Sequence, residues 1–278
     1  MSRGVLLFAH NTPNTNYALM AAWTALRVEK YLGVPVALVT DQESVTSLKQ
    51  LGLGPYTIFD DIIYSVEVSD QKRPLGDQWV PFRNTDRVNA YDFTPFDETL
   101  IIDTDIAIAS DRLNRVWGHD RDLLVSLNAR DILGRTHNGF DYLKDHGVPF
   151  YWATECYFRK GREAQTFFNY CRRIKENYAW TSLVYGVPSS PLRNDHVWSI
   201  ALNELGGKAG AGWADVIPGT LIYSMDRDRI IDLGLDSATI LGQDKDKHRL
   251  ARVVKQDLHI INKFDLMPLI MKELGVAQ

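Results

Sequence analysis

An apolar run at residues 5–9, closed by turn formers, constrains the fold of this chain more than any other feature. Val5-Leu-Leu-Phe-Ala9 is apolar at every position, which is typical of a strand buried on both faces of a parallel sheet. Turn-forming residues 10–14 follow, and the apolar residues of segment 17–32 then recur at helical spacing before Gly33. We therefore expect a central strand, a loop and a helix, as in a βαβ unit.

The same pattern repeats along the chain. A strand at 34–40 ends at Asp41, and it is followed by a short helix at 44–51, a breaker at 52–55 and a strand at 56–59. After a polar loop with Lys72, Arg73 and Pro74, a helical stretch containing Arg87 and Tyr91 leads into a buried strand at 99–102. Further on we expect strands at 123–127 and 151–158, helices at 162–178 and 195–205, and loops at 188–191 and 206–212. This alternation predicts a doubly wound α/β fold.

Composition excludes several classes of protein. The 278 residues, 45% of them hydrophobic, supply enough core for one large domain and argue against disorder. A net charge of −4 argues against a protein that coats nucleic acid through overall charge, although it leaves room for a local basic groove. No run of eighteen apolar residues and no signal-peptide pattern is present, so we expect a soluble chain. Two cysteines, Cys156 and Cys171, are too few for a disulfide scaffold and favour a reducing cytoplasm.

The tripeptide Asp103-Thr104-Asp105 follows the strand at 99–102 directly. Carboxylates at the carboxyl end of a buried strand point into the crevice where open α/β sheets bind ligands. Asp oxygens suit Mg²⁺ or Mn²⁺, and such an ion would neutralise a diphosphate. A solvated turn remains the alternative. Aspartyl-phosphate phosphatases fit less well, because their motif lies near the chain start and has Thr or Val where Ala107 stands.

Several short motifs, taken in order, resemble the GT-A glycosyltransferases of family eight, the glycogenin and lipopolysaccharide galactosyltransferase group. The matching positions are Asn16-Tyr17, Arg87, Ile102-Asp103-Thr104-Asp105, Asn194-Asp195-His196, His259 and Lys263. The resemblance implies a single Rossmann-like GT-A domain over residues 1–278 with a mostly parallel twisted sheet flanked by helices. Residues 1–110 or so would form the nucleotide-binding half, and about 111–278 the acceptor half with the C-terminal metal and phosphate segment.

The resemblance also implies a site. Asp103, Asp105 and His259 would hold Mn²⁺ or Mg²⁺, while Arg87, Asp103 and Lys263 would contact a nucleoside-diphosphate sugar, with UDP the expected nucleotide. Asn11 stands in His10-Asn11-Thr12, where the family contacts uracil, and Asp41 ends the second strand, where it could meet the nucleoside or cap a helix. From the residues alone, His259 could equally be a hydrogen-bonded core histidine, and Arg87 a solvated helix charge.

Two carboxylates are candidates for catalysis. Similarity to family eight implies transfer of a hexosyl or pentosyl group with retention, by front-side attack through an oxocarbenium-like state or through a transient enzyme nucleophile. Asp195 and Glu155 are the candidates for stabilising that cation or for acting as the nucleophile. Glu155 lies in an apolar aromatic strand, where an unpaired carboxylate would be expensive. Asp195, after Asn194, could instead only favour a helix N-terminus.

The acceptor is left open by the sequence. Residues 4–41 also look like those of glycosyltransferases encoded by tailed bacteriophages, which suggests a hydroxymethylated base in phage DNA and work in the host cytoplasm. A surface polysaccharide or small metabolite is the alternative acceptor. A non-catalytic nucleotide-sugar-binding protein and a nucleotidyltransferase are competing functions. A positive run, Lys245 to Arg249 with Arg252 and Lys255, is either a solvated face or a site for a polyanion.

Overall fold

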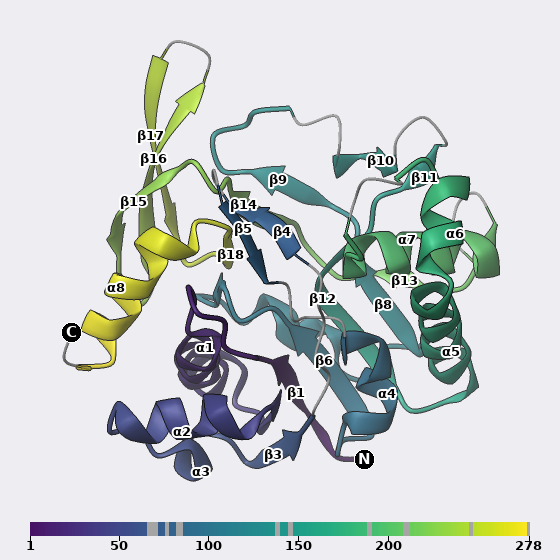
Figure 1. Cartoon of the computed structure of the whole chain (residues 1–278), viewed down its shortest axis with the longest axis horizontal. Coiled ribbons are helices and arrows are strands. Elements are labelled where there is room, and N and C mark those ends of the chain that lie inside the picture. The colour runs from purple at the N-terminus through teal and green to yellow at the C-terminus, as the bar shows by residue number, and fades with distance from the viewer. Residues whose placement is uncertain are drawn as a thin grey trace.

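The computed structural model describes residues 1–65, 72–75, 78–81, 86–136, 140–143, 147–187, 191–207, 212–244 and 247–276. A seven-stranded sheet in the order β13-β8-β12-β6-β1-β2-β3 forms its centre (Figure 1). Its strands are β1 (Arg3–Phe8), β2 (Val36–Thr40), β3 (Asp61–Tyr64), β6 (Glu98–Ile102), β8 (Leu123–Ser126), β12 (Trp152–Arg159) and β13 (Asp215–Val216).

The sheet is mostly parallel, as expected from its apolar strands. β1 pairs in parallel with both β2 and β6, β2 with β3, and β8 with β13. Only β12 runs antiparallel, between β6 and β8. The carboxyl ends of β1, β2 and β6 therefore meet at one edge of the sheet, where parallel α/β folds bind ligands.

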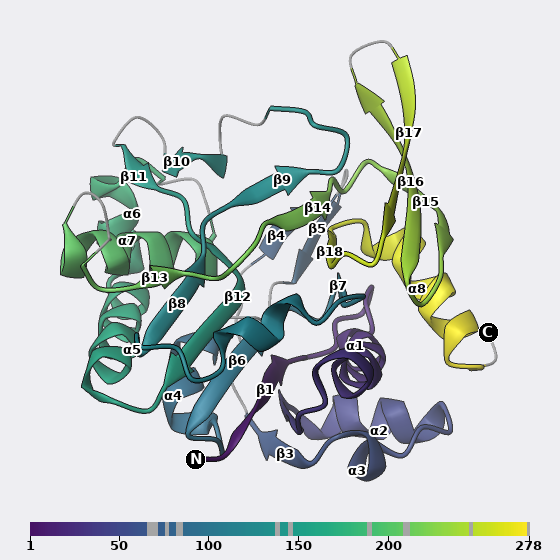
Figure 2. The ribbon, with the colours of Figure 1, turned by 180° about the vertical axis from the view of Figure 1, so that it is seen from behind.

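Helices cover both faces of this sheet (Figures 1 and 2). The α-helices are α1 (Tyr17–Leu32), α2 (Gln42–Gln50), α3 (Pro55–Ile58), α4 (Ala90–Phe93), α5 (Arg162–Glu176), α6 (Tyr178–Val184), α7 (Asn194–Gly206) and α8 (Lys263–Glu273). Two 3-10 helices are η1 (Asp86–Asn89) and η2 (Arg112–Val116). Buried side chains of α1 and α2 share one apolar core with the sheet, and those of α5 and α7 share the other.

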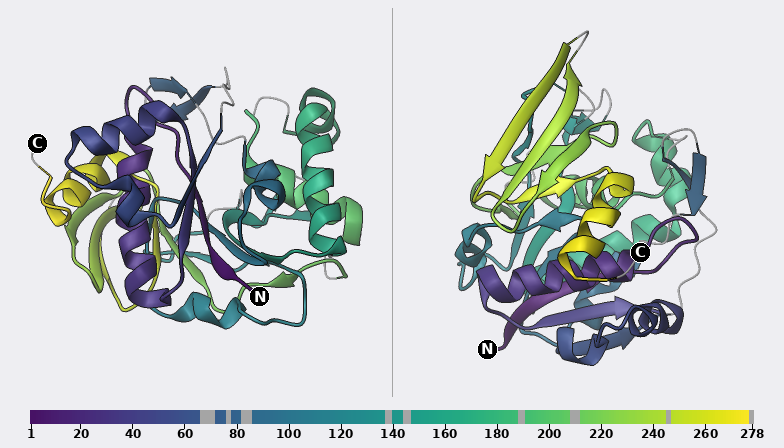
Figure 3. Two further views of the ribbon diagram at one scale, coloured as in Figure 1. Left: turned by 90° about the horizontal axis from the view of Figure 1, so that it is seen from below. Right: turned by 90° about the vertical axis from the view of Figure 1, so that its left-hand side faces the viewer.

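Two smaller sheets complete the part that concerns the site. One has the order β7-β18-β14-β9, and the other has the order β15-β16-β17. The far end of β16 and β17 projects from the body, as the right-hand view of Figure 3 shows. The strands of the two sheets are β7 (Ile106–Ala107), β9 (Ala129–Asp131), β14 (Leu221–Ser224), β18 (Leu258–Ile260), β15 (Arg229–Leu233), β16 (Ser237–Asp244) and β17 (Lys247–Val254). Two short hairpins are formed by β4 (Lys72–Leu75) with β5 (Gln78–Pro81) and by β10 (Tyr142–Leu143) with β11 (Val148–Pro149).

Local signals explain where the first helix begins and ends. The helix predicted at 17–32 is observed with those bounds, because the Asn16 side chain accepts a hydrogen bond from the Leu19 amide and Gly33 adopts a left-handed φ of 63°. The strands expected at 34–40, 99–102, 123–127 and 151–158 are also present, within two residues at each end. Among the described residues, no helix combines the length and apolar character that a membrane crossing requires.

Two sequence-based predictions of local structure are wrong. Residues 55–58 form a helical turn instead of a strand, since Pro55 opens a helix at its first position, and the strand follows at Asp61–Tyr64. Lys72, Arg73 and Pro74 lie in β4, which pairs with β5, so this polar stretch is part of a hairpin. Of the positive run, Lys245 and Asp246 lie outside the described residues, Lys247 to Arg252 lie in β17, and Lys255 follows that strand.

Candidate functional site

The Asp-x-Asp motif lies where the central sheet gives way to the small one. Asp103 follows β6 directly, and its amide donates to the carbonyl of Thr154 at 2.9 Å. Asp105 precedes β7 and is 5% exposed, whereas the Asp103 side chain is 21% exposed. The loop between them is held by α1, because Thr24 Oγ1 donates to the Thr104 carbonyl at 2.8 Å. One carboxylate is thus open to a ligand and the other is buried behind it.

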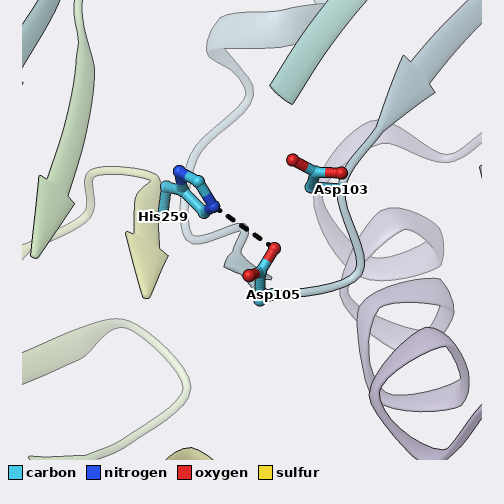
Figure 4. A group of neighbouring side chains, drawn as sticks. All are labelled: Asp103, Asp105 and His259. Atoms are coloured by element: carbon cyan, nitrogen blue, oxygen red, sulfur yellow. Dashed lines mark ion pairs between the residues drawn. The ribbon is translucent and has the colours of Figure 1, made fainter. Parts of the chain in front are cut away.

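Strand pairing brings His259 to this motif across more than 150 residues of sequence. In the antiparallel pair of β18 with β7, His259 lies opposite Ile106, and the Ile260 amide donates to the Asp105 carbonyl at 2.9 Å. His259 Nε2 then lies 3.3 Å from Asp105 Oδ1, and the three side chains point toward one another (Figure 4). The buried Nδ1 of His259 has no hydrogen-bond partner among the described residues.

Lys263 completes the cluster. It is the first residue of α8, whose N-cap is Asn262, and its buried ammonium donates to Asp105 Oδ2. Burial by itself would raise the pKa of Asp105, but the charges of Lys263 and His259 outweigh burial and hold that pKa well below its usual range. The Asp105 charge in turn raises the pKa of His259 against the opposing effect of burial. Asp105 is therefore ionised at neutral pH.

The donor atoms suit a hard divalent cation. One ligand atom each from Asp103, Asp105 and His259 lies within 4.8 Å of the other two. Two carboxylate oxygens and an imidazole nitrogen leave further coordination positions for a phosphate or water. The residues present fit such an ion.

Arg87 links this cluster to Asp195. Its guanidinium, 1% exposed, donates to Asp103 and to the Ala153 carbonyl at 2.6 Å. The Ala153 amide donates to Asp195 Oδ1 at 2.8 Å, and Arg193 donates to Asp195 Oδ2, also at 2.8 Å. Burial opposes the charge on Asp195, but Arg193 and the Ala153 amide outweigh it and lower its pKa. Arg87 is thus a buried support of Asp103 and not a solvated helix charge.

Glu155 lies in β12 opposite Ile102, the residue before Asp103. Its side chain is fully buried, its carboxylate is paired with Arg112, and Ser126 Oγ lies 3.3 Å from its second oxygen. The carboxylate that the sequence offered as a catalytic candidate is therefore held in a buried ion pair.

Asn11 and Asp41 lie at the ends of β1 and β2. The Asn11 side chain accepts from the Ala18 amide at 2.9 Å, and Asp41 caps α2 by accepting from the Ser44 amide at 2.7 Å. A polar depression of about 660 Å³ between the loop after β1 and α2 includes Asn11 and Gln42 in its lining. The helix cap that we weighed for Asp41 is observed, while a nucleoside contact stays a prediction.

Sequence reasoning did not single out Asp257. This buried carboxylate accepts from the Ala109 and Ser110 amides at 3.0 Å each and from Arg112 Nε at 3.2 Å. Because it lies two residues before His259, it fixes β18 against the segment that follows β7. In the sequence, the only signal for Asp257 was its position two residues before His259, a candidate metal ligand.

Comparisons with known proteins give distant structural likenesses only. No family model and no curated protein matches the sequence. The galactosyltransferase LgtC is 13% identical over 77% of this chain and 72% of its own, with a TM-score of 0.44. The glycosyltransferase GlyE of Streptococcus pneumoniae TIGR4 is 12% identical with a TM-score of 0.44, and the match covers 78% of this chain but only 46% of GlyE. The inositol-1-phosphate CTP transferase of T. maritima is 10% identical over 100% of this chain and 98% of its own, with a TM-score of 0.46. Sugar transferases and a nucleotidyl transferase are thus among the matches.

Proposed function

We propose that this chain is a metal-dependent glycosyltransferase that moves a hexosyl or pentosyl group from a nucleoside-diphosphate sugar to a hydroxyl. The observation that carries the proposal is the convergence of Asp103, Asp105, His259 and Lys263 at the carboxyl end of β6. A lysine directly beside the ligand group suits a site that stabilises a departing diphosphate. Nucleotidyl transfer would also use a cation and release a diphosphate, so the released product distinguishes the two reactions.

Each residue has a distinct role in this reaction. Asp103, Asp105 and His259 would hold Mn²⁺ or Mg²⁺, which supplies electrostatic stabilisation of the leaving diphosphate. Lys263 would donate to a phosphate oxygen, and Arg87 would keep Asp103 oriented through its bond to the Ala153 carbonyl. Asn11 and Asp41, at the ends of β1 and β2, are the candidates for nucleoside contacts, with UDP as the proposed nucleotide.

Asp195 is the better of the two catalytic candidates. It is ionised, it is linked to Asp103 through Ala153 and Arg87, and its side chain is partly exposed at 16%. An anion in this position would stabilise positive charge that develops on the sugar, or attack the anomeric carbon so that configuration is retained. Burial raises the pKa of Glu155 although Arg112 is paired with it, and the side chain has no exposed surface, so we assign it the weaker claim.

For the acceptor we propose a hydroxymethylated base in DNA, with a polysaccharide or small metabolite as the alternative. The two free, buried cysteines fit work in a reducing cytoplasm, which would be that of the host if a bacteriophage encodes the chain.

The test is donor hydrolysis by the full chain over a panel of nucleoside-diphosphate sugars with Mn²⁺. We expect release of nucleoside diphosphate from one donor, lost by at least a hundredfold in Asp105→Asn and Asp103→Asn and retained in Asp120→Ala, an exposed control. Thermal unfolding of each variant separates a lost site from a lost fold. Release of pyrophosphate would favour a nucleotidyltransferase, and metal-dependent binding of a donor without release in the presence of acceptors would favour a binding protein.

A further inference from the structure

The two carboxylates of the Asp-x-Asp motif differ in how many oxygens they can offer to a ligand. Arg87 is bonded to Oδ1 of Asp103, and Oδ2 of Asp103 has no hydrogen-bond partner among the described residues. At Asp105, Oδ1 lies 3.3 Å from His259 Nε2, as the dashed line in Figure 4 shows, and Oδ2 accepts a hydrogen bond from the ammonium of Lys263. Both oxygens of Asp105 are therefore engaged by side chains of this chain.

The ammonium of Lys263 competes with a cation for Asp105. The two side chains are only 8% and 7% exposed, so solvent ions screen their charges little. A divalent cation that binds Asp105 shares a single carboxylate with that ammonium, and like charges so close together repel strongly in a buried site. The backbone of Lys263 is fixed, because it begins α8 and the preceding Asn262 donates to the Asp228 carbonyl at 2.8 Å. Only the flexible side chain of Lys263 can move away from the cation.

The charge balance of the cluster indicates what allows the ammonium to leave Asp105. The carboxylates of Asp103 and Asp105 are paired with the cations of Arg87 and Lys263, so these groups are neutral as a set. A divalent cation alone would give the set an excess of positive charge, and an uncompensated charge is costly in a buried site. Each phosphate of a nucleoside-diphosphate sugar carries a negative charge. A divalent cation and a diphosphate that bind together therefore leave the site neutral.

We propose that Lys263 opposes the binding of a free cation and that the site takes up its cation together with a diphosphate. The ammonium holds Asp105 until a donor binds, and it then moves from Oδ2 of Asp105 to a phosphate oxygen. Lys263 thus has a second role besides the phosphate contact, since its charge decides which form of the metal is bound. This inference rests on the proposed function for the identity of the donor.

A purely supporting role for Lys263 predicts the opposite effect of its removal. If the ammonium only held Asp105 in place for the metal, removing it would weaken the binding of a free cation. If the ammonium competes with the cation, removing it strengthens that binding, because the buried carboxylate of Asp105 then lacks a counter-charge. Since coupling between two ligands is reciprocal, competition also predicts that a diphosphate strengthens cation binding more in the parent than in a variant without this charge.

The test measures binding of Mn²⁺ alone to the full chain, by titration followed by electron paramagnetic resonance. A second titration contains UDP and is corrected for the Mn²⁺ that UDP binds in solution. We expect Lys263→Met to bind Mn²⁺ alone about tenfold more tightly than the parent and to gain less affinity from UDP. Lys263→Arg keeps the charge and should bind Mn²⁺ about as weakly as the parent. The matched control is Lys272→Met, an exposed lysine in the last turn of the same helix, which should leave the affinity unchanged.

Three results would overturn the proposal. They are Lys263→Met binding Mn²⁺ no more tightly than the parent, Lys263→Arg gaining as much affinity as Lys263→Met, and UDP strengthening Mn²⁺ binding equally in the parent and in Lys263→Met. Melting curves show whether each variant folds, and Lys263→Gln, which can still donate a hydrogen bond to Asp105 without the charge, replaces Lys263→Met if the latter does not fold. Failure here is distinguishable from failure of the proposed function, because the titration of Mn²⁺ alone contains no donor and release of nucleoside diphosphate is measured separately.

Discussion

The central sheet and the small β7-β18-β14-β9 sheet are held together by different forces. Strands β1, β2 and β6 bury Val, Leu and Ile side chains against helices on both faces. Around the small sheet lie three buried ion clusters, which are Asp105 with His259 and Lys263, Arg112 with Glu155 and Asp257, and Arg135 with Asp131 and Asp228. Apolar burial is non-directional and does not require one particular partner side chain, whereas a buried charge must be paired with an opposite charge in a suitable position. The first sheet makes a stable layer, and the second specifies how distant segments meet.

The largest effect should come from removing one member of an ion cluster. Arg112→Met would leave the carboxylates of Glu155 and Asp257 buried without a counter-charge, at a cost of about 3–5 kcal/mol of unfolding free energy. Urea unfolding measures this loss, with the exposed Arg115→Met as a control that should change stability by less than about 0.5 kcal/mol. A loss below about 1 kcal/mol in Arg112→Met would remove the contrast between the two sheets.

A core truncation in the central sheet should cost about as much or slightly less, yet leave the site alone. Leu38→Ala, in β2, should lower the unfolding free energy by about 3 kcal/mol through lost burial and a cavity. We expect its Mn²⁺ affinity to match that of the unmodified chain, whereas Arg112→Met should weaken it because Asp257 then holds β18 less firmly. Mn²⁺ titration followed by electron paramagnetic resonance measures both. Equal weakening in the two variants would show that the sheets are not independent.

A smaller effect is expected at the end of β2. Asp41→Ala removes the N-cap of α2 and should cost about 1 kcal/mol, while Asp41→Asn keeps a good cap and should cost much less. The pair also tests the proposed nucleoside contact, because only a contact predicts that Asp41→Asn weakens donor binding at unchanged stability. Calorimetric titration with donor and a melting curve give the two quantities. Donor affinity unchanged in Asp41→Asn would leave the cap as its only role.

The smallest effect should be the contribution of Asp131 to the loss of stability at low pH. Burial opposes the charge on Asp131, but hydrogen bonds from Arg135 and Leu133 outweigh it, so its pKa is lowered from 3.8 in the folded chain. The unfolded chain therefore binds a proton first, and this contribution to stability is present above about pH 4 and is lost as pH falls through the lowered folded pKa. Between pH 7 and pH 3.5 the stability of Asp131→Asn should decline less than that of the parent, as urea midpoints would show. A parallel decline would mean that Asp131 contributes no such linkage.

The central sheet could be predicted from the sequence better than the small β7-β18-β14-β9 sheet. The apolar runs of β1, β2 and β6 and the caps of α1 are local signals, so strands and helix were predicted almost to the residue. Asp103 and Asp105 could be placed because they directly follow such a strand. His259 and Lys263 came only from resemblance, since nothing local reveals that β18 pairs with β7.

The rest depended on contacts between distant residues. Glu155 was an isolated carboxylate in the sequence, and its partner Arg112 lies 43 residues away, so its ion pair could not be foreseen. The β15-β16-β17 sheet was not predicted either, because its alternation of exposed charged and apolar residues is weak beside the fully apolar central strands. Local pattern therefore determined the layers, and charge pairing across the chain determined the site.

The pairing of β18 with β7 also has a consequence for synthesis of the chain. Asp103 and Asp105 leave the ribosome long before His259 and Lys263, and until those residues emerge the buried Asp105 has neither its histidine nor its lysine. A nascent chain can therefore complete the central sheet while its site is still incomplete. The cluster of Asp103, Asp105, His259 and Lys263 is therefore assembled only after β18 has been synthesised and has paired with β7.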